Sequence, residues 1–250
     1  MSRRRARRRT AAALAAPLPR DRIAGVDTFR GGALCLMIVY HFAFDLRFYR
    51  VTNADFNSDP FWLGFRALIV TSFLALVGIS LVLADRAGVS RRRFRQRIGM
   101  IVACALAASV GSWLAFRTTY IYFGILHCIA VSSVLALPFV RRPRSAMLMG
   151  AAVIVAGLSL SHPAFDSRAL SWIGFTTHRP ATEDYVPLFP WSGVVFVGIA
   201  AGHALARAAF RPLAPLAAAP SWLRALGRHS LLVYMVHQPI LLGMLWVVLR

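Results

Sequence analysis

Apolar residues along this chain gather in seven long runs, and short polar segments separate the runs. The runs cover residues 31–48, 61–84, 98–116, 121–140, 145–161, 187–206 and 229–249. Each has roughly the 17–25 residues that a helix needs to cross the core of a bilayer. The pattern therefore predicts an all-α membrane protein, a polytopic bundle of about seven transmembrane helices.

The polar segments between the runs predict the orientation of these helices. Residues 1–30, 86–97, 141–144 and 207–228 hold 22 of the 29 arginines, and all four segments fall on one side of seven spans. By the positive-inside rule this side is cytoplasmic. The opposite side receives six of the nine acidic residues. We therefore expect a cytoplasmic N-terminus and a C-terminus on the outer side.

The same pattern divides the chain into two parts. Residues 1–22 are basic, with only a short alanine-rich apolar stretch that Pro17 interrupts. We interpret them as a disordered cytoplasmic arm that contacts anionic lipid headgroups. Residues 23–250 are expected to form a single transmembrane domain.

Composition excludes several classes of soluble protein. Hydrophobic residues make up 58% of the chain and charged residues only 15%, whereas a soluble domain has about 25% charged residues. The net charge of +20 raises the question of nucleic acid, but no basic groove with interleaved aromatic residues is evident. The three cysteines lie inside apolar runs without a CxxC pattern, which argues against a disulfide framework.

An ionisable residue inside a predicted span is costly and is a functional candidate by default, and four such residues are singled out here. They are His41 and Asp45 in the first span, His127 in the fourth and His237 in the seventh. At about 1.5 Å per helical residue, their depths overlap in the middle and outer part of the membrane. The four side chains could therefore line one cavity.

His41 and Asp45 are four residues apart, so that a helix places both on one face. A carboxylate beside an imidazole holds its tautomer and stabilises the imidazolium that forms after proton abstraction. The pair is thus a candidate base and orienting group for an amine or hydroxyl nucleophile. Two other interpretations stay open: hydrogen-bonded packing residues, and a zinc site that includes His127 and His237 but lacks a recognised ligand spacing.

At the cytoplasmic start of the first span, the stretch "RDRIAGVDTFRGG" places Arg20, Arg22 and Arg30 around Asp27. One interpretation is a positive-inside cluster with a single compensating acid. The other is an anion site, because arginines form forked contacts to phosphate and the two following glycines allow close approach of the backbone.

Four stretches, in order along the chain, resemble the bacterial relatives of heparan-alpha-glucosaminide N-acetyltransferase, a family within a broader set of membrane acyltransferases. The stretches are "RIAGVDTFRGGALCLMIVYHFAFDL" from residue 22, "FGILHCIAV" from residue 123, "FPWSGVVFVGIAAG" from residue 189 and "LGRHSLLVYMVHQP" from residue 226. The likeness extends from about residue 22 to the C-terminus. Each stretch alone is a weak signal, and the four in register are fairly specific.

The resemblance implies an enzyme that takes an acetyl group from cytoplasmic acetyl-CoA and transfers it to an amine or hydroxyl of a sugar-like acceptor on the outer side. We expect a location in the bacterial cytoplasmic membrane and, because no recognised ligand spacing is present, no metal. Carried over by position, His41 becomes the catalytic candidate with Asp45 beside it. Arg22, Asp27 and Arg30 become candidates for the donor site.

The same resemblance implies that His127, Trp191, His237 and Gln238 line the substrate cavity. It leaves open the identity of the acceptor, the oligomeric state, direct transfer against an acetyl-histidine intermediate, and which intramembrane histidine is the base. A proton-coupled transporter that relays protons through His41 and Asp45 is the first alternative function. A membrane protein whose polar residues only pack its helices is the second.

Overall fold

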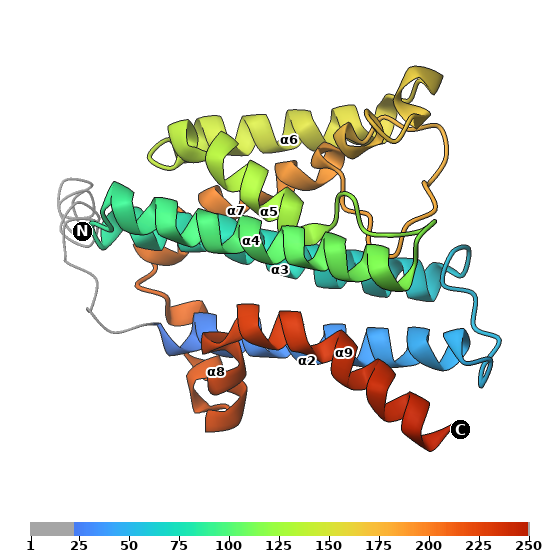
Figure 1. Cartoon of the computed structure of the whole chain (residues 1–250). Coiled ribbons are helices and arrows are strands. Elements are labelled where there is room, and N and C mark those ends of the chain that lie inside the picture. Colours follow the sequence, from blue (N-terminus) through green and yellow to red (C-terminus); the bar gives the residue numbers. More distant parts are fainter. Residues whose placement is uncertain (1–22, 250) are drawn as a thin grey trace, which may run out of the picture. The chain divides into compact units, whose positions relative to one another are not determined.

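A computed structural model describes residues 23–249 as a chain of helices (Figure 1). The α-helices are α2 (Ala24–Phe48), α3 (Pro60–Arg86), α4 (Arg91–Ala115), α5 (Ile125–Leu135), α6 (Pro143–Ser159), α7 (Leu188–Arg207), α8 (Ser221–Arg228) and α9 (Ser230–Val248). Short 3-10 helices are η1 (Leu137–Phe139), η2 (Pro163–Asp166), η3 (Ser171–Ile173), η4 (Arg211–Leu213) and η5 (Pro215–Ala218). The basic segment 1–22 lies outside the described residues.

The predicted fold class is confirmed, because each of the seven apolar runs contains an α-helix. Five helices of the described region are long and apolar enough to cross a membrane: α2, α3, α4, α7 and α9. The apolar helices α5 and α6 are shorter. In the run 121–140 the α-helix stops at Leu135 and a 3-10 turn over Pro138 follows, since proline removes a helical hydrogen bond and clashes with the preceding turn.

The starts of two long helices follow from local sequence. Asp59 precedes α3, and its Oδ1 accepts a hydrogen bond from the backbone N–H of Phe61 at 2.8 Å. Ser90 is the N-cap of α4, and its hydroxyl accepts from the N–H of Arg93 at 3.4 Å. Side-chain oxygens at these positions satisfy backbone donors that have no partner within the helix.

The described residues form two compact units. One comprises residues 74–212, and the other comprises residues 23–73 together with 213–249. The division falls within α3, whose first half belongs to the second unit and whose second half belongs to the first. The expectation that residues 23–250 act as one domain stays a prediction.

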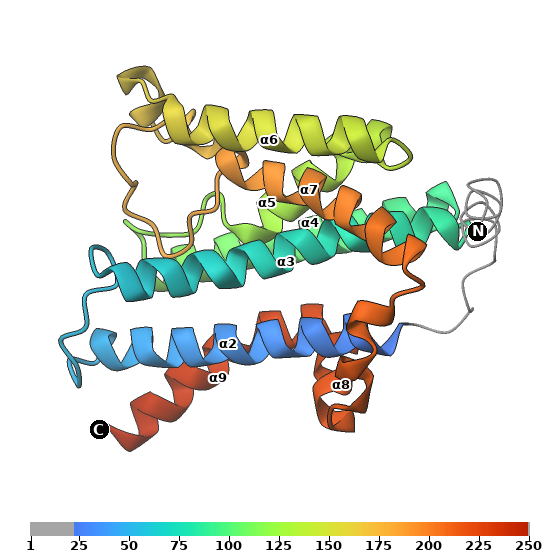
Figure 2. The same ribbon diagram turned by 180° about the vertical axis from the view of Figure 1, so that it is seen from behind.

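In the unit 74–212, small residues allow α7 to approach its neighbours closely. α6 packs along α7, and α5 contacts both α4 and α7 (Figure 2). A Cβ added at Gly198 of α7 would meet the backbone of Ala75 on α3, and one added at Gly78 would meet the carbonyl oxygen of Val195. The spacing in "GIAAG" (198–202) thus serves close helix packing, as small-xxx-small patterns commonly do.

The loop between α6 and α7 closes onto the start of α5 in the same unit. Asp184 accepts a hydrogen bond from the N–H of Ile125 at 2.8 Å, and a β-bridge joins Phe123 to Tyr185. The Tyr185 hydroxyl donates to the carbonyl oxygen of the buried Ser171 at 2.7 Å. These contacts attach the C-terminal part of the loop to the start of α5 and to the loop's own interior.

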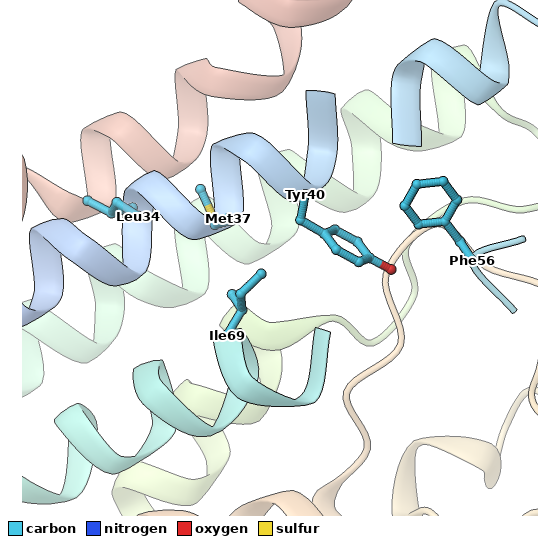
Figure 3. Packing of buried hydrophobic residues seen from close by; sticks show 5 residues of the cluster. All are labelled: Leu34, Met37, Tyr40, Phe56 and Ile69. Carbon is cyan, nitrogen blue, oxygen red and sulfur yellow. The ribbon is translucent and has the colours of Figure 1, made fainter. Parts of the chain in front are cut away.

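The other unit is built around α2. α8 and α9 pack against α2, and a buried cluster joins α2 to the first half of α3 (Figure 3). Its buried members are Leu34, Met37, Tyr40, Phe56 and Ile69. The ring of Tyr40 makes edge contacts with Phe56, Trp62 and Phe65, with ring centroids 5.4–6.0 Å apart. Such aromatic pairs add to the stabilisation that burial alone provides.

Candidate functional site

Polar side chains of α2 and α9 meet inside the unit of residues 23–73 and 213–249. His41 and Asp45 lie one turn apart on α2, as predicted, and His237 and Gln238 are adjacent on α9. The rings of His41 and His237 are in edge contact, with centroids 5.0 Å apart. Four residues that were predicted to serve the site are therefore brought together by two helices far apart in the sequence.

The carboxylate of Asp45 joins the two helices directly. It is 1% exposed, and its Oδ1 accepts a hydrogen bond of 2.7 Å from Nε2 of Gln238. A buried carboxylate is costly unless it is hydrogen-bonded. Gln238 thus satisfies a buried charge from across the helix interface, and Asp45 in turn fixes the position of the helix that carries His237.

The hydrogen bond of His237 determines its tautomer. Nδ1 lies 2.6 Å from the carbonyl oxygen of Tyr234, and since a carbonyl only accepts, Nδ1 must donate. In the neutral imidazole the lone pair is then on Nε2. This nitrogen is buried and has no hydrogen-bond partner among residues 23–249. His237 therefore presents a basic nitrogen beside the ring of His41, which is itself partly exposed.

Two contacts show the relative direction of α2 and α9, because a later residue of α2 meets a later residue at α9. His237 contacts His41. Further along, the hydroxyl of Tyr49 donates to the carbonyl oxygen of Leu242 at 3.2 Å. The two helices consequently run parallel (Figure 1).

At the other end of α2, Asp27 is the centre of an ion-pair cluster. Asp27 is 3% exposed; its Oδ1 lies 3.2 Å from Nη1 of Arg30, and its Oδ2 lies 3.5 Å from Nε of Arg228. Arg30 also donates to the carbonyl oxygen of Gly227 at 3.5 Å. Two guanidinium groups thus surround one carboxylate and leave a net positive charge.

Glycines let this end of α2 approach α8 closely. A Cβ added at Gly227 would meet the carbonyl oxygen of Asp27, and one added at Gly31 would meet that of Leu223. The stretch "DTFRGG" and helix α8 are therefore in close backbone contact. Arg22, the third predicted donor-site residue, lies outside the described residues.

His127 and Trp191 belong to the unit 74–212, whereas the other described site residues belong to the second unit. His127 is at the start of α5, and its Nδ1 accepts from the backbone N–H of Gly124 at 3.2 Å. Its Nε2 then carries the proton and lies 3.4 Å from the hydroxyl oxygen of Ser109. Both ring nitrogens thus have protein partners. Trp191 is partly buried in the first turn of α7.

Sequence analysis missed two charged residues of the second unit. Arg228 lies in the stretch "LGRHS" that carried the resemblance, but only the structure pairs it with Asp27. Arg66 is the one charged residue in the apolar run 61–84, and an ionisable residue within a span was a sufficient signal. Its Nη1 is buried without a hydrogen-bond partner among the described residues.

None of the residues 23–249 forms a group of three or more histidine, cysteine, aspartate or glutamate side chains suited to hold a metal ion.

Outside the spans, the pKa of one carboxyl group near the end of α2 is strongly lowered. The Ser58 hydroxyl, together with the N–H of Asn57 and the charge of Arg47, holds the pKa of Asp55 at about 2. This aspartate therefore organises the loop between α2 and α3 as an anion.

Comparison with known proteins identifies the family. Residues 22–239 match the family model described as heparan-alpha-glucosaminide N-acetyltransferase, catalytic. Searches of the curated proteins and of the solved structures found no significant match. The matched range includes the whole of α2 through α8 and reaches Pro239 of α9, just beyond His237 and Gln238. The chain thus belongs to the family of the heparan-alpha-glucosaminide N-acetyltransferase catalytic domain.

Proposed function

We propose that this chain is an integral-membrane acetyltransferase that moves an acetyl group from acetyl-CoA to an amine or hydroxyl of a sugar-like acceptor. The observation that carries the proposal is the contact of His41 with His237 between two apolar helices of a chain in an acetyltransferase family. Two apposed imidazoles are expensive to keep in a membrane and are suited to proton transfer near neutral pH.

Acetyl-CoA would dock at the end of α2 that carries Asp27 and Arg30, with Arg22 nearby in the sequence. The side chain of Arg30 is 20% exposed and that of Arg228 is 51% exposed, so both can be reached from solvent. Because one carboxylate offsets only one of the two guanidinium groups, the remaining positive charge favours the phosphates of CoA. Asp27 would serve here to position the arginines.

In the transfer step the acceptor nitrogen or oxygen attacks the carbonyl carbon of the thioester. A bond to that carbon forms, the carbon–sulfur bond breaks, and CoA leaves as the thiolate. His41, the more exposed histidine, takes the acceptor proton and passes it to Nε2 of His237, whose Nδ1 is held by the carbonyl of Tyr234. The proton finally passes from His237 to the CoA thiolate, so that both histidines end in their starting states.

A second route has the same overall reactants and products but passes through a covalent intermediate. His41 attacks the thioester first and carries the acetyl group as acetyl-imidazole until the acceptor displaces it. In both routes Asp45 and Gln238 act as positioning residues, because their hydrogen bond holds α9 against α2. For Trp191 a place in the acceptor cavity stays a prediction. For His127, whose ring nitrogens both have partners within its own unit, we expect a structural role instead.

The proposed location is the bacterial cytoplasmic membrane, with the basic N-terminal segment inside and the C-terminus outside. The parallel direction of α2 and α9 supports this orientation, since parallel first and last spans require termini on opposite sides. Acetyl-CoA is then drawn from the cytoplasm and the acceptor from the outer side. Homo-oligomers and bound lipid are compatible with this arrangement.

The donor half of the proposal is tested by equilibrium binding of acetyl-CoA to detergent-purified protein. We expect saturable binding by the wild type and by His41→Ala, and weaker binding by Arg30→Gln. Free CoA is the control ligand, and Arg92→Gln, which removes an exposed arginine at the start of α4, is the control variant. Absence of saturable binding by folded wild-type protein would contradict the assignment of acetyl-CoA as donor.

A further inference from the structure

Arg66 is a charge that the proposed catalytic step does not use. It lies in α3, the most apolar of the five candidate spans, six residues after the first residue of the helix, or about 9 Å along its axis. A charged side chain within a span is costly, and this makes it a functional candidate by default. Arg66 is partly buried, and a compensating anion would favour its retention there.

The described protein does not supply that partner. Arg66 makes no hydrogen bond or ion pair with residues 23–249, and its Nη1 is buried. The four carboxylates of this unit are engaged elsewhere. Asp27 pairs with arginines, Asp45 binds Gln238, Asp55 pairs with Arg47, and Asp59 caps the start of α3.

The position of Arg66 along α3 brings it to the depth of the histidine pair. α3 runs antiparallel to α2 in this unit, because Tyr40 contacts Trp62 and Phe65 while Met37, earlier on α2, joins the cluster with Ile69. Arg66 falls between these contacts. It also shares a face with Trp62 and Ile69, at the spacings of four and three residues.

We propose that Arg66 binds a permanent oxyanion, a carboxylate or phosphate, carried by the acceptor. Arginine presents a planar fork of donors that matches such groups in two-point contacts. The charge of Arg66 is present in the resting protein, so a ligand with a permanent negative charge compensates it throughout the reaction. The inference rests on the proposed function and deepens it, since it makes the acceptor an anionic sugar rather than a neutral one.

The phosphate of a phospholipid headgroup offers the same chemistry, and the test separates the two sources. Purified full-length protein is delipidated and its Tm is measured with glucosamine 6-phosphate, with glucosamine, and with short-chain phosphatidylglycerol. Binding to the folded state raises Tm with ligand concentration. We expect glucosamine 6-phosphate, but not glucosamine, to raise the Tm of the wild type.

Three variants complete the test. Arg66→Gln should weaken the apparent affinity for the phosphate about 10- to 100-fold, as loss of a charged hydrogen bond does, and Arg66→Lys should retain part of it. Arg50→Gln, which removes an exposed arginine in the turn after α2, should respond like the wild type. Arg66→Met without ligand should have a Tm at or above that of the wild type, because it removes an uncompensated charge.

Each outcome decides the proposal. A Tm response to phosphatidylglycerol alone that requires Arg66 assigns the site to lipid and overturns the acceptor. Equal responses of wild type and Arg66→Gln to every probe overturn the oxyanion site. If the Arg66-dependent response to the sugar phosphate is found but acetyl transfer is not, the site stands and the proposed function falls.

Discussion

Hydrogen bonds give His127 and His237 opposite tautomers, and this distinguishes their roles. Nδ1 of His237 donates to a carbonyl and leaves a lone pair on a buried Nε2. Nδ1 of His127 accepts from the N–H of Gly124, and this places the proton on Nε2. The free lone pair of His237 suits a proton acceptor, whereas the ring of His127 is occupied in holding the start of α5.

We predict that His127 contributes chiefly to stability. His127→Ala leaves the Gly124 N–H without its partner and should lower the free energy of unfolding by about 1 kcal/mol, as loss of a helix cap does. His127→Gln keeps an acceptor at the same helix position and should retain most of the stability and the turnover. Thermal unfolding and acetyl transfer measured on both variants check this. A loss of turnover in a stable His127→Gln protein would instead support a role in the acceptor cavity.

Among the residues of the site, sequence reasoning predicted the identities better than the partners. Helical spacing placed His41 and Asp45 on one face, and the structure keeps them there. It could not predict that Asp45 binds Gln238, because that bond joins residues 193 positions apart. Nor could it assign a tautomer to His237, which depends on a local carbonyl. Arg66 was open to prediction, since one charge in an apolar run is visible in the sequence.

At the scale of helices, the start of α2 is held by backbone contacts that only glycine permits. α8 approaches so closely that the carbonyl oxygen of Asp27 lies where a Cβ of residue 227 would be. Arg228, the next residue, then reaches the carboxylate of Asp27. The short helix α8 escaped prediction because it lies within a segment whose arginines indicated a cytoplasmic loop.

We predict that Gly227→Ala destabilises this contact. The added methyl group must displace backbone rather than a flexible side chain, and overpacking of this kind costs about 1–3 kcal/mol. The expected result is a lower Tm and weaker acetyl-CoA binding, because Arg228 and Arg30 lose their common support at Asp27. Gly243→Ala in α9 is the matched control, since a Cβ there meets nothing within 4 Å. Equal behaviour of the two variants would contradict the close contact.

At the scale of the whole molecule, the alternation of apolar runs and arginine clusters predicted the all-helical membrane fold. The lengths of individual helices were harder to predict. α2 begins at Ala24, seven residues before the apolar run, because Asp27 and Arg30 are satisfied by each other and by α8 and so tolerate a helical, buried position. α5 is shorter than its run because Pro138 ends regular helix.

We predict opposite locations for the two ends of the chain. The parallel direction of α2 and α9 requires the two ends on opposite sides of the membrane, and the four arginine-rich segments place the N-terminal side in the cytoplasm by the positive-inside rule. Reporter fusions in a bacterial host check this: a phosphatase at the C-terminus should be active, and one at residue 142, between η1 and α6, should be inactive. Activity at both positions would refute the arrangement.

The measurement that tests the central claim most directly is acetyl transfer by protein in proteoliposomes, with labelled acetyl-CoA and a panel of amino sugars and sugar phosphates. We predict acetylated product and an equal amount of free CoA from the wild type. His41→Ala and His237→Ala should each lower the rate by about 100-fold or more, as loss of a general base does. Arg50→Gln should leave the rate unchanged. Transfer that persists in both histidine variants would contradict the site, and binding of acetyl-CoA without transfer to any acceptor of the panel would contradict the proposed reaction.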